Sequence, residues 1–317
     1  MERRTFIKTA GAISAAIPAF NSGVFADTKE ADSSKPVDLV ALHGGEAADM
    51  FEKGIAEMGG MSRFVKEGQK VVIKMNASFN RTPEFGATTN PQLVGAVVKH
   101  CKQAGASEIL CLDYTCGSKD WNGCYTISGI KAEVEANGGK MIAANSQNLF
   151  KEQEIPNGVA IKKAMVHEMA INPDVLINIP VLKQHSGTKI TGAMKNFMGL
   201  VWNRRDWHNS DLPQCIADYC TFQKPALNIL DAYRVMLEFG PRGRSAESAP
   251  VVKYQVISTD IVATDTAAVG IFASVVNQHK IGIPYGLGEI GYIKKGEDLG
   301  IGTTDLSKLN VKKISLA

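Results

Sequence analysis

The stretch DVLINIPV at residues 174–181 decides the fold class, because it is an almost unbroken run of apolar residues. A strand that is apolar on both faces is typical of a parallel sheet covered by helices on both sides. The runs KVVIK at 70–74 and EILCLD at 108–113 have the same character. Such strands alternate with helix-like segments along the chain, which predicts an α/β fold with a mostly parallel sheet and helices on both faces.

The flanking sequence supplies the other elements of this fold. Further strands are predicted at 37–42, 140–144, 226–231, 254–258 and 309–315. Helices are predicted at 47–58, 90–103, 127–137, 166–171, 212–222 and 261–276. Asn90 and Pro91 suit the cap and the first position of the second helix. A glycine-rich loop is expected after Val181.

The N-terminus resembles an export signal. RRTFIK at residues 3–8 precedes a mildly apolar stretch at 9–20 and the small-residue site VFA at 24–26. These three parts predict a twin-arginine signal peptide at 1–26, with the twin-arginine translocase as the partner during export. The apolar stretch is shorter than the roughly 20 residues of a membrane span, so membrane contact is expected only transiently, through the signal. The alternative is a chance arginine pair ahead of a buried helix.

The remaining chain is expected to be a polar linker at 27–36 and a single α/β domain at 37–317, in a periplasmic or other extracytoplasmic location. Hydrophobic residues make up 44% and charged residues 21%, which are globular values. The net charge of +3 comes without a basic, aromatic-interleaved stripe, so no nucleic acid is expected as a partner. No GxGxxG motif follows the first predicted strand, and the chain has no GxxxxGK[ST] or GxSxG motif, which argues against a dinucleotide fold, a P-loop ATPase and an α/β-hydrolase.

The six cysteines do not form a CxxC pair, so neither a zinc ribbon nor an iron–sulfur cluster is expected. Cys101 and Cys111 are predicted to lie in the core. Cys116 and Cys124 bracket a loop, and an extracytoplasmic location would permit a disulfide there. Because the twin-arginine route exports folded protein, oxidation during folding is not assured, and the sequence leaves the bridge open.

Polar side chains follow nearly every predicted strand, where ligands bind in open α/β sheets. They are Lys74, Asn76, Asp113, Asn145, Lys183, His185, Asp231, Asp260 and Asp265. Ordinary loop polarity is the alternative explanation for about half of them. Thr88 and Thr89 precede the helix at 90–103, whose free amides offer a second anion contact.

The segment from residue 178 to 208 is the richest in chemistry. It reads NIPVLKQHSGTKITGAMKN at 178–196, followed by RRDWH at 204–208. Glycines, hydroxyls and cations together favour a phosphate or carboxylate pocket, with Lys183, Lys195 and Arg204 holding the anion. A solvated basic loop is the alternative.

His185 and His208 are the candidates for proton transfer in this segment. The same two imidazoles with a strand-end carboxylate, Asp231 or Asp113, would suit a divalent metal, although no spacing demonstrates such a site. His43, after the first strand, is a further candidate. Lys74, Asn76, Thr88 and Thr89 are the expected additional substrate contacts.

Several motifs occur in an order that resembles the family called domain of unknown function 362. They are IKMN at 73–76, GATTNP at 86–91, AGASEILCLD at 104–113, NIPVLKQH at 178–185, GAMKNFMG at 192–199, RRDWH at 204–208 and LNILDA at 227–232. The resemblance covers about residues 37–300. Many members carry a ferredoxin-type insertion, but this chain lacks its cysteine runs, so cluster binding is not carried over.

The resemblance implies a shared site lined by Lys183, His185, Lys195, Asn196, Arg204, His208 and Asp231. Asn196 enters through the resemblance alone. The chain is also distantly similar to the nickel-dependent lactate racemase group, which uses histidines and lysines around a bound cofactor. We expect an exported enzyme that acts on a small anionic substrate. The alternative is a non-catalytic periplasmic protein that binds an anion or a metal, or an accessory protein for another exported enzyme.

Overall fold

The computed structural model describes most of the chain, namely residues 20, 25–116 and 120–316. The predicted signal peptide falls largely outside the described residues. Its two described phenylalanines, Phe20 and Phe25, are buried and pack edge to face, with ring centroids 5.2 Å apart. Phe20 also contacts the ring of Tyr254 at 5.5 Å. These two side chains therefore pack against the folded body.

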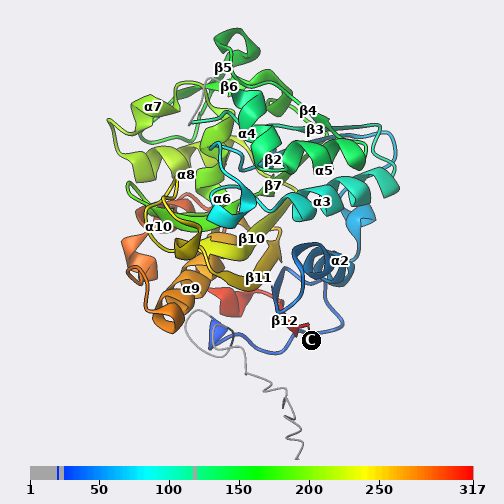
Figure 1. The fold of residues 1–317 in the computed structure, drawn as a ribbon, viewed down its shortest axis with the longest axis vertical. Helices are drawn as coiled ribbons and strands as arrows, with labels where there is room; N and C mark the ends of the chain where they lie inside the picture. Colours follow the sequence, from blue (N-terminus) through cyan, green and yellow to red (C-terminus); the bar gives the residue numbers. More distant parts are fainter. Residues whose placement is uncertain (1–19, 21–24, 117–119, 317) are drawn as a thin grey trace, which may run out of the picture.

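A ten-stranded mixed sheet forms the centre of the molecule (Figure 1). Its order is β12 (Val311–Ser315), β1 (Leu39–His43), β11 (Val251–Ser258), β10 (Leu227–Met236), β7 (Val175–Ile179), β2 (Lys70–Met75), β3 (Glu108–Cys111) and β4 (Lys140–Met141). Beside this path, β8 (Val181–His185) pairs with β10 and β9 (Lys189–Thr191). Within this described sheet, the antiparallel pairs are β1–β11, β10–β11 and β8–β9. All its other pairs are parallel, which confirms the prediction of a mostly parallel α/β sheet.

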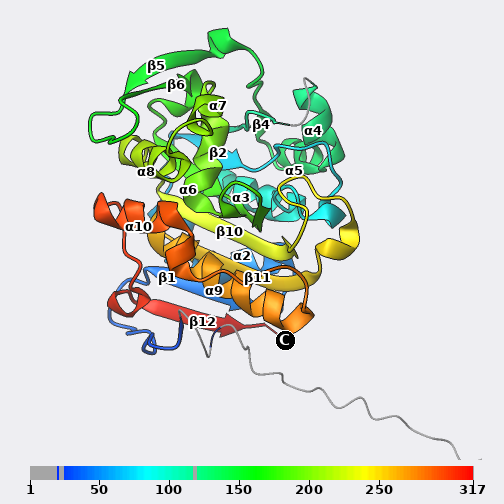
Figure 2. The ribbon, with the colours of Figure 1, turned by 90° about the vertical axis from the view of Figure 1, so that its left-hand side faces the viewer.

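Helices cover both faces of this sheet (Figures 1 and 2). One layer contains α2 (Ala47–Glu57), α3 (Pro91–Gln103) and α5 (Ile130–Ala136). The other contains α6 (Ala193–Asn196), α8 (Leu212–Phe222), α9 (Ile261–His279) and α10 (Gly291–Asp298). Each layer buries its own apolar cluster against the strands. Two further short helices are α4 (Trp121–Ile127) and α7 (Arg204–Trp207).

The strands alternate between these two layers. In β2, Val71, Ile73 and Met75 belong to the apolar cluster under α2 and α3, whereas Val72 packs in the opposite cluster. Lys74 therefore points to the α6 side, because neighbouring strand residues face opposite ways. This alternation brings a cation to the buried face on which α6 lies.

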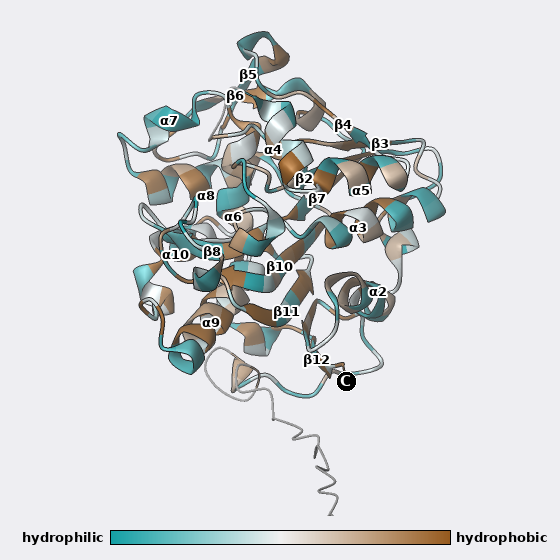
Figure 3. Cartoon of the chain, viewed as in Figure 1, coloured by the Kyte–Doolittle hydropathy of each residue, from teal (hydrophilic) through white to brown (hydrophobic). Residues whose placement is uncertain are grey.

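Helix α9 is the longest apolar helix of the described chain. By length and composition it would be able to span a membrane, but 72% of the relevant window is buried inside the fold. Its apolar colour in Figure 3 continues into the neighbouring central strands. The helix thus has the burial expected of a core helix in this sheet-centred fold.

Several local predictions were wrong. The helix expected at 166–171 is strand β6 (Lys163–His167) followed by a short 3-10 turn, and β6 pairs with β5 (Phe150–Glu154). Strand alternation explains this, since Ala164 and Val166 are buried beside exposed Lys163. The loop expected after Val181 contains the hairpin β8–β9. The helix expected at 127–137 is interrupted by Gly129, whose φ of 76° ends α4 and starts α5.

Candidate functional site

A small cavity lies where β2 and β8 meet α6 and α7. Its volume is about 90 Å³. It is lined by Asn76, Ser78, Phe79, Cys116, Lys183, His185, Thr191, Lys195, Asn196, Met198, Gly199, Arg204, His208 and Pro241. Larger hollows exist elsewhere, including one of about 740 Å³ beside Asp174 at the amino end of β7, but of the polar residues predicted to follow strands only Asp260 lines that one. The carboxyl edge of the sheet is where such folds bind ligands.

The cavity brings together most of the predicted site residues. Seven of them line it, namely Asn76, Lys183, His185, Lys195, Asn196, Arg204 and His208. Lys74 does not line the cavity, but its ammonium donates to Asn196, which does. Thr88, Thr89 and Asp231 do not line it. The hydroxyl of Thr89 instead accepts from the Asn76 amide and donates to the Ile179 carbonyl, both at 2.8 Å, so Thr89 fixes the loop after β2.

Seven lining residues were not predicted: Ser78, Phe79, Cys116, Thr191, Met198, Gly199 and Pro241. Ser78 and Cys116 follow the ends of β2 and β3, so the strand-end rule, extended by a few residues, finds them. Thr191 ends β9 directly before Gly192. Met198 and Gly199 lie in the GAMKNFMG motif at 192–199, whereas Phe79 and Pro241 show no sequence signal.

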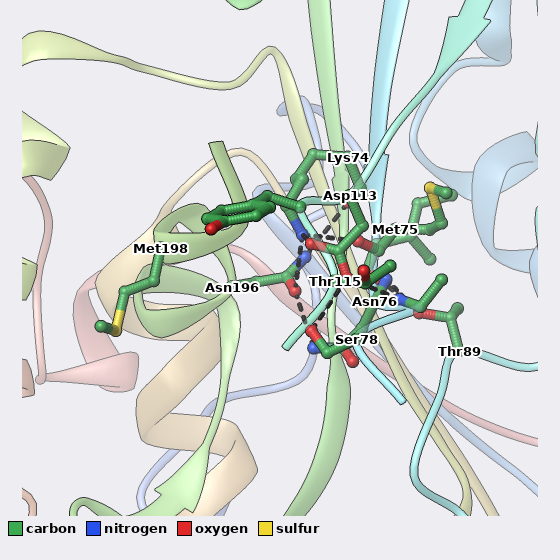
Figure 4. A network of polar contacts seen from close by, with 12 residues as sticks. Lys74, Met75, Asn76, Ser78, Thr89, Asp113, Thr115, Asn196 and Met198 are labelled. Atoms are coloured by element: carbon green, nitrogen blue, oxygen red, sulfur yellow. Dashed lines mark hydrogen bonds and ion pairs between the residues drawn. The ribbon is translucent and has the colours of Figure 1, made fainter. Parts of the chain in front are cut away.

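A buried ion pair forms the floor of the site. Lys74 Nζ lies 3.0 Å from Asp113 Oδ1, and both side chains are 0% exposed. Lys74 also donates to Asn196 Oδ1 at 3.1 Å, and Asn76 Nδ2 donates to the same oxygen at 3.1 Å (Figure 4). Burial lowers the pKa of Lys74, and the charge of Asp113 opposes this shift. Asp113 also accepts from Ser78 Oγ at 2.9 Å, so this carboxylate is held on several sides.

A row of buried amides extends the floor across the sheet. Lys74 on β2 is in register with Asn178 on β7, which is in register with Asn228 on β10. Asn178 Nδ2 donates to Asn228 Oδ1 at 3.0 Å, and Asn196 Nδ2 donates to Asn178 Oδ1 at 2.9 Å. Buried amides need such partners. The row joins α6 to three strands and fixes the position of Asn196.

Helix α6 is held at its start by a carboxylate from α9. Asp265 accepts from the backbone amides of Ala193 and Met194. A Cβ at Gly192 would collide with the Asp265 carboxylate, so this approach requires glycine. Burial raises the pKa of Asp265 to about 7, and the two amide hydrogen bonds oppose the shift. Asp265 thus positions α6 without lining the cavity.

Gly199 makes an equivalent close approach at the other end of the GAMKNFMG motif. A Cβ there would lie 2.6 Å from Lys74 Cε and would collide with Asp113 Oδ1. Non-bonded carbons normally stay about 3.5–4.0 Å apart. The two outer glycines of the motif therefore let the segment that carries Lys195 and Asn196 sit directly on the ion pair.

Lys183 projects from β8 into the cavity. Its ammonium donates to Asn76 Oδ1 at 3.3 Å and to the Ala87 carbonyl, and lies 5.1 Å from the ring centre of Phe79. Burial lowers the pKa of Lys183 to about 7, and the charge of Lys195 adds to this effect. Lys183 is therefore partly neutral near physiological pH.

Lys195 is the least satisfied cation of the site. Its side chain is buried, and its ammonium has one hydrogen-bond contact among the described residues, to Met198 Sδ at 3.4 Å. A thioether is a weak acceptor. Burial lowers the pKa of Lys195 to about 8, with a further lowering by the charge of Arg204. The Thr191 hydroxyl, also buried in the cavity lining, has no hydrogen-bond partner in the described structure.

Arg204 is fixed by backbone carbonyls at the start of α7. It donates to Tyr114 O at 2.7 Å, Met198 O at 3.2 Å and Thr115 O at 3.2 Å, and it lies 4.1 Å from the ring centre of Tyr114. In the part of the chain that the structure describes, no carboxylate lies within 4.0 Å of the charged groups of Lys183, Lys195 or Arg204. The cavity therefore has an unbalanced positive charge.

The two histidines differ in state. His185 Nδ1 accepts from the backbone amides of Gly187 at 2.9 Å and Thr188 at 3.3 Å, which assigns the ring proton to Nε2. Burial, followed by the charges of Lys195 and Lys183, holds the pKa of His185 far below its usual value. His208 is an exposed residue directly after α7. Its imidazole is still partly shielded from solvent, and this partial desolvation is the main cause that lowers its pKa. His185 is thus a neutral donor, and His208 is free to exchange protons.

The three ligands predicted for a metal are not assembled. Within the described ranges, no three His, Cys, Asp or Glu side chains are grouped so as to hold an ion. Asp231 lies outside the cavity lining and accepts from the amides of Asn90 at 2.7 Å and Tyr233 at 3.0 Å. Its pKa is raised to about 6 by burial. The predicted set of His185, His208 and Asp231 is therefore not brought together in the described structure.

The two loop cysteines are separate. Cys116 is an exposed free thiol that lines the cavity, whereas Cys124 is a buried free thiol on α4. The disulfide that the sequence left open is absent from the described structure. Cys101 and Cys111 are buried, as predicted.

Comparisons with known proteins give one family, one protein of similar sequence and one distantly similar structure. The family profile described as Domain of unknown function (DUF362) matches residues 71–270. The thylakoid-associated protein sll1697 of Synechocystis sp. is 25% identical over 241 residues, which is 71% of this chain and 72% of that protein. The lactate racemase apoprotein of Thermoanaerobacterium thermosaccharolyticum is distantly similar in structure, with a TM-score of 0.43 and 13% identity. That alignment covers 69% of this chain, which spans about half, 54%, of the racemase chain.

Proposed function

The chain belongs to the DUF362 family, and from this premise we propose that its cavity binds a small carboxylate or phosphate anion and acts on it as an enzyme. One observation carries the proposal: the Lys195 ammonium and the Thr191 hydroxyl are buried in the same cavity without a suitable partner. Buried polar groups in proteins are normally satisfied. An anion would accept from both.

The size and charge of the cavity support a small ligand. A water molecule occupies about 30 Å³ of liquid, so a volume of about 90 Å³ corresponds to only a few such molecules. Lys195 and Arg204 supply charge, and the neutral His185 Nε2–H supplies a donor that stays in place over the physiological pH range. His208 at the rim is the group proposed to take or give a proton.

Ligand-induced stabilisation tests the binding step. Acetate, lactate and inorganic phosphate, each at constant ionic strength, should raise the melting temperature, because a ligand that binds only the folded state stabilises it. Lys195→Met and Thr191→Val should abolish the rise while both variants still fold. Lys66→Met, at an exposed lysine, is the matched control and should keep it. Equal shifts in Lys195→Met and wild type would refute the proposed pocket.

Turnover separates an enzyme from a binding protein. Once a bound anion is identified, His208→Gln should lower kcat by about 100-fold or more if the imidazole transfers a proton. The affinity of the His208→Gln variant for the same anion should change little. Tight binding without turnover over a broad panel of small acids would favour the non-catalytic or accessory alternative.

We also propose export through the twin-arginine translocase, on the basis of RRTFIK at residues 3–8. Replacing Arg3 and Arg4 with lysine in the full chain should retain the protein in the cytoplasm of a bacterial host. Cell fractionation measures this directly. Unchanged delivery to the extracytoplasmic fraction would contradict the proposed route.

A further inference from the structure

We propose that Cys116 is a nucleophile directed at the anion in this cavity, which makes it a site of covalent modification by small carboxylates that carry an electrophilic carbon. The inference rests on the proposed anion site and deepens it. It assigns the cavity a reactive atom in addition to its binding groups.

Cys116 is distinguished by its access. Of the six cysteines, which all lie in the described part of the chain, Cys116 is exposed and the other five are buried. It follows the end of β3, and its backbone amide donates to the Ser78 carbonyl at 2.9 Å, which ties it to the loop after β2. Both residues line the cavity. The accessible thiol and the anion-binding groups therefore share one space.

The groups around this thiol indicate what it would meet. Lys195 and Thr191 are more than nine-tenths buried, line the same cavity and lack a suitable acceptor or donor in the described structure. Lys183 and Lys195 line the same cavity as Cys116, and the negative charge of a Cys116 thiolate would raise the pKa values of both ammonium groups. A carboxylate held by Lys195 would bring the adjoining carbon of a small ligand to the sulfur.

The covalent step is a substitution. Cys116 Sγ attacks the carbon next to the carboxylate, the S–C bond forms, and the bond from that carbon to its leaving group breaks with the electron pair departing on the leaving group. His208, exposed at the rim and with a pKa below its usual value, accepts the thiol proton. No oxidant, reductant or metal is needed, and the charges balance.

Alkylation by iodoacetate and iodoacetamide tests this directly. Both reagents lose iodide to the same thiolate, but only iodoacetate carries a carboxylate. The ratio of their rate constants is independent of the thiolate fraction, because that fraction is common to both. For Cys116 we expect this ratio to exceed that of glutathione at the same pH by at least about tenfold, the lower end of the range for charge-focused encounters.

Variants of the full chain show which residues cause the labelling and the raised rate ratio. Intact-mass spectrometry should show a single adduct in wild type and none in Cys116→Ser over the same time. Lys195→Met should lower the ratio of the iodoacetate rate constant to the iodoacetamide rate constant to about that of glutathione, whereas Lys66→Met should leave this ratio within about twofold of wild type. Added acetate should slow iodoacetate selectively in wild type.

The outcomes distinguish this inference from the proposed function. One outcome is that calorimetry shows acetate binding while the iodoacetate-to-iodoacetamide rate ratio of Cys116 equals that of glutathione. Another is that acetate binds but neither reagent labels Cys116. Either outcome overturns the assignment of Cys116 and leaves the proposed anion pocket in place. If acetate, lactate and phosphate do not bind and the ratio is also that of glutathione, both proposals fail. A raised ratio that disappears in Lys195→Met supports both.

Discussion

Replacing Lys195 with methionine should make the empty protein more stable while removing its anion binding. Methionine keeps the length and the apolar stem of the side chain and removes the ammonium. That ammonium is buried beside a thioether sulfur at 3.4 Å, so its loss leaves no strong hydrogen bond broken. Removing an uncompensated buried charge is favourable when an apolar group of similar volume replaces it.

The magnitude follows from the protonation equilibrium. The pKa of Lys195 falls from 10.5 to about 8 in the folded state, and each unit corresponds to 1.36 kcal/mol, so the charged form costs about 3 kcal/mol of folding free energy. Because the folded pKa lies below the unfolded one, the full penalty applies below pH 8. It disappears as the pH rises from about 8 to 10.5.

Urea unfolding at pH 7 and pH 10 measures this effect. In a buffer without carboxylates or phosphate, Lys195→Met should be more stable than wild type at pH 7 by up to about 3 kcal/mol. The difference should shrink markedly at pH 10. Removing the Lys195 charge also relieves Lys183, whose pKa that charge lowers, so Lys183 adds to the stability difference in the same direction. A variant that is less stable than wild type at pH 7, or a difference independent of pH, would refute the assignment of an unbalanced buried ammonium.

Two further predictions concern the floor of the site and its histidines. Gly199→Ala should destabilise the protein by about 2 kcal/mol or more, because its Cβ would press on the buried ion pair. Gly288→Ala, where a Cβ meets nothing within 4 Å, should stay within about 0.5 kcal/mol in the same denaturation assay; equal effects would contradict the close approach. In NMR titrations from pH 5 to 8, His185 should show no protonation and His208 should titrate with a midpoint below 6.5. Protonation of His185 in that window would contradict the acceptor role of Nδ1.

The sheet was predictable because a strand that is buried on both faces has a continuous run of apolar residues in the sequence. Continuous apolar runs identified β2, β3 and β7, and Asn90 with Pro91 marked the start of α3, where the Asn90 side chain accepts from two backbone amides. The hairpins β5–β6 and β8–β9 were missed because their strands are short and partly exposed. Their alternation spans too few residues to separate a strand from a helix or a loop.

The candidate site was predictable to the extent that strand ends converge on one edge of the sheet. His185 ends β8 with Lys183 two residues before it, and Asn76 follows β2, so the topology gathers them at the cavity. Asp231 ends an apolar run in the sequence, but β10 continues past it to Met236, and its carboxylate accepts from the amides of Asn90 and Tyr233. Side-chain direction at a strand end depends on the loop that folds over it, which the sequence pattern does not contain.

The buried amides explain why the cations can remain unpaired. Asn178, which looks like a defect in an apolar strand, bonds Asn196 and Asn228 and so ties α6 to the sheet. With Asp265 accepting from the amides at the start of α6, the backbone that carries Lys195 is fixed at both sides of this residue. A charge fixed among buried side chains interacts with a ligand more strongly than the same charge in water, and it needs little reorganisation when the ligand arrives. The instability expected at Lys195 and the anion binding expected there are therefore two consequences of one arrangement, so a single substitution should change them in opposite directions.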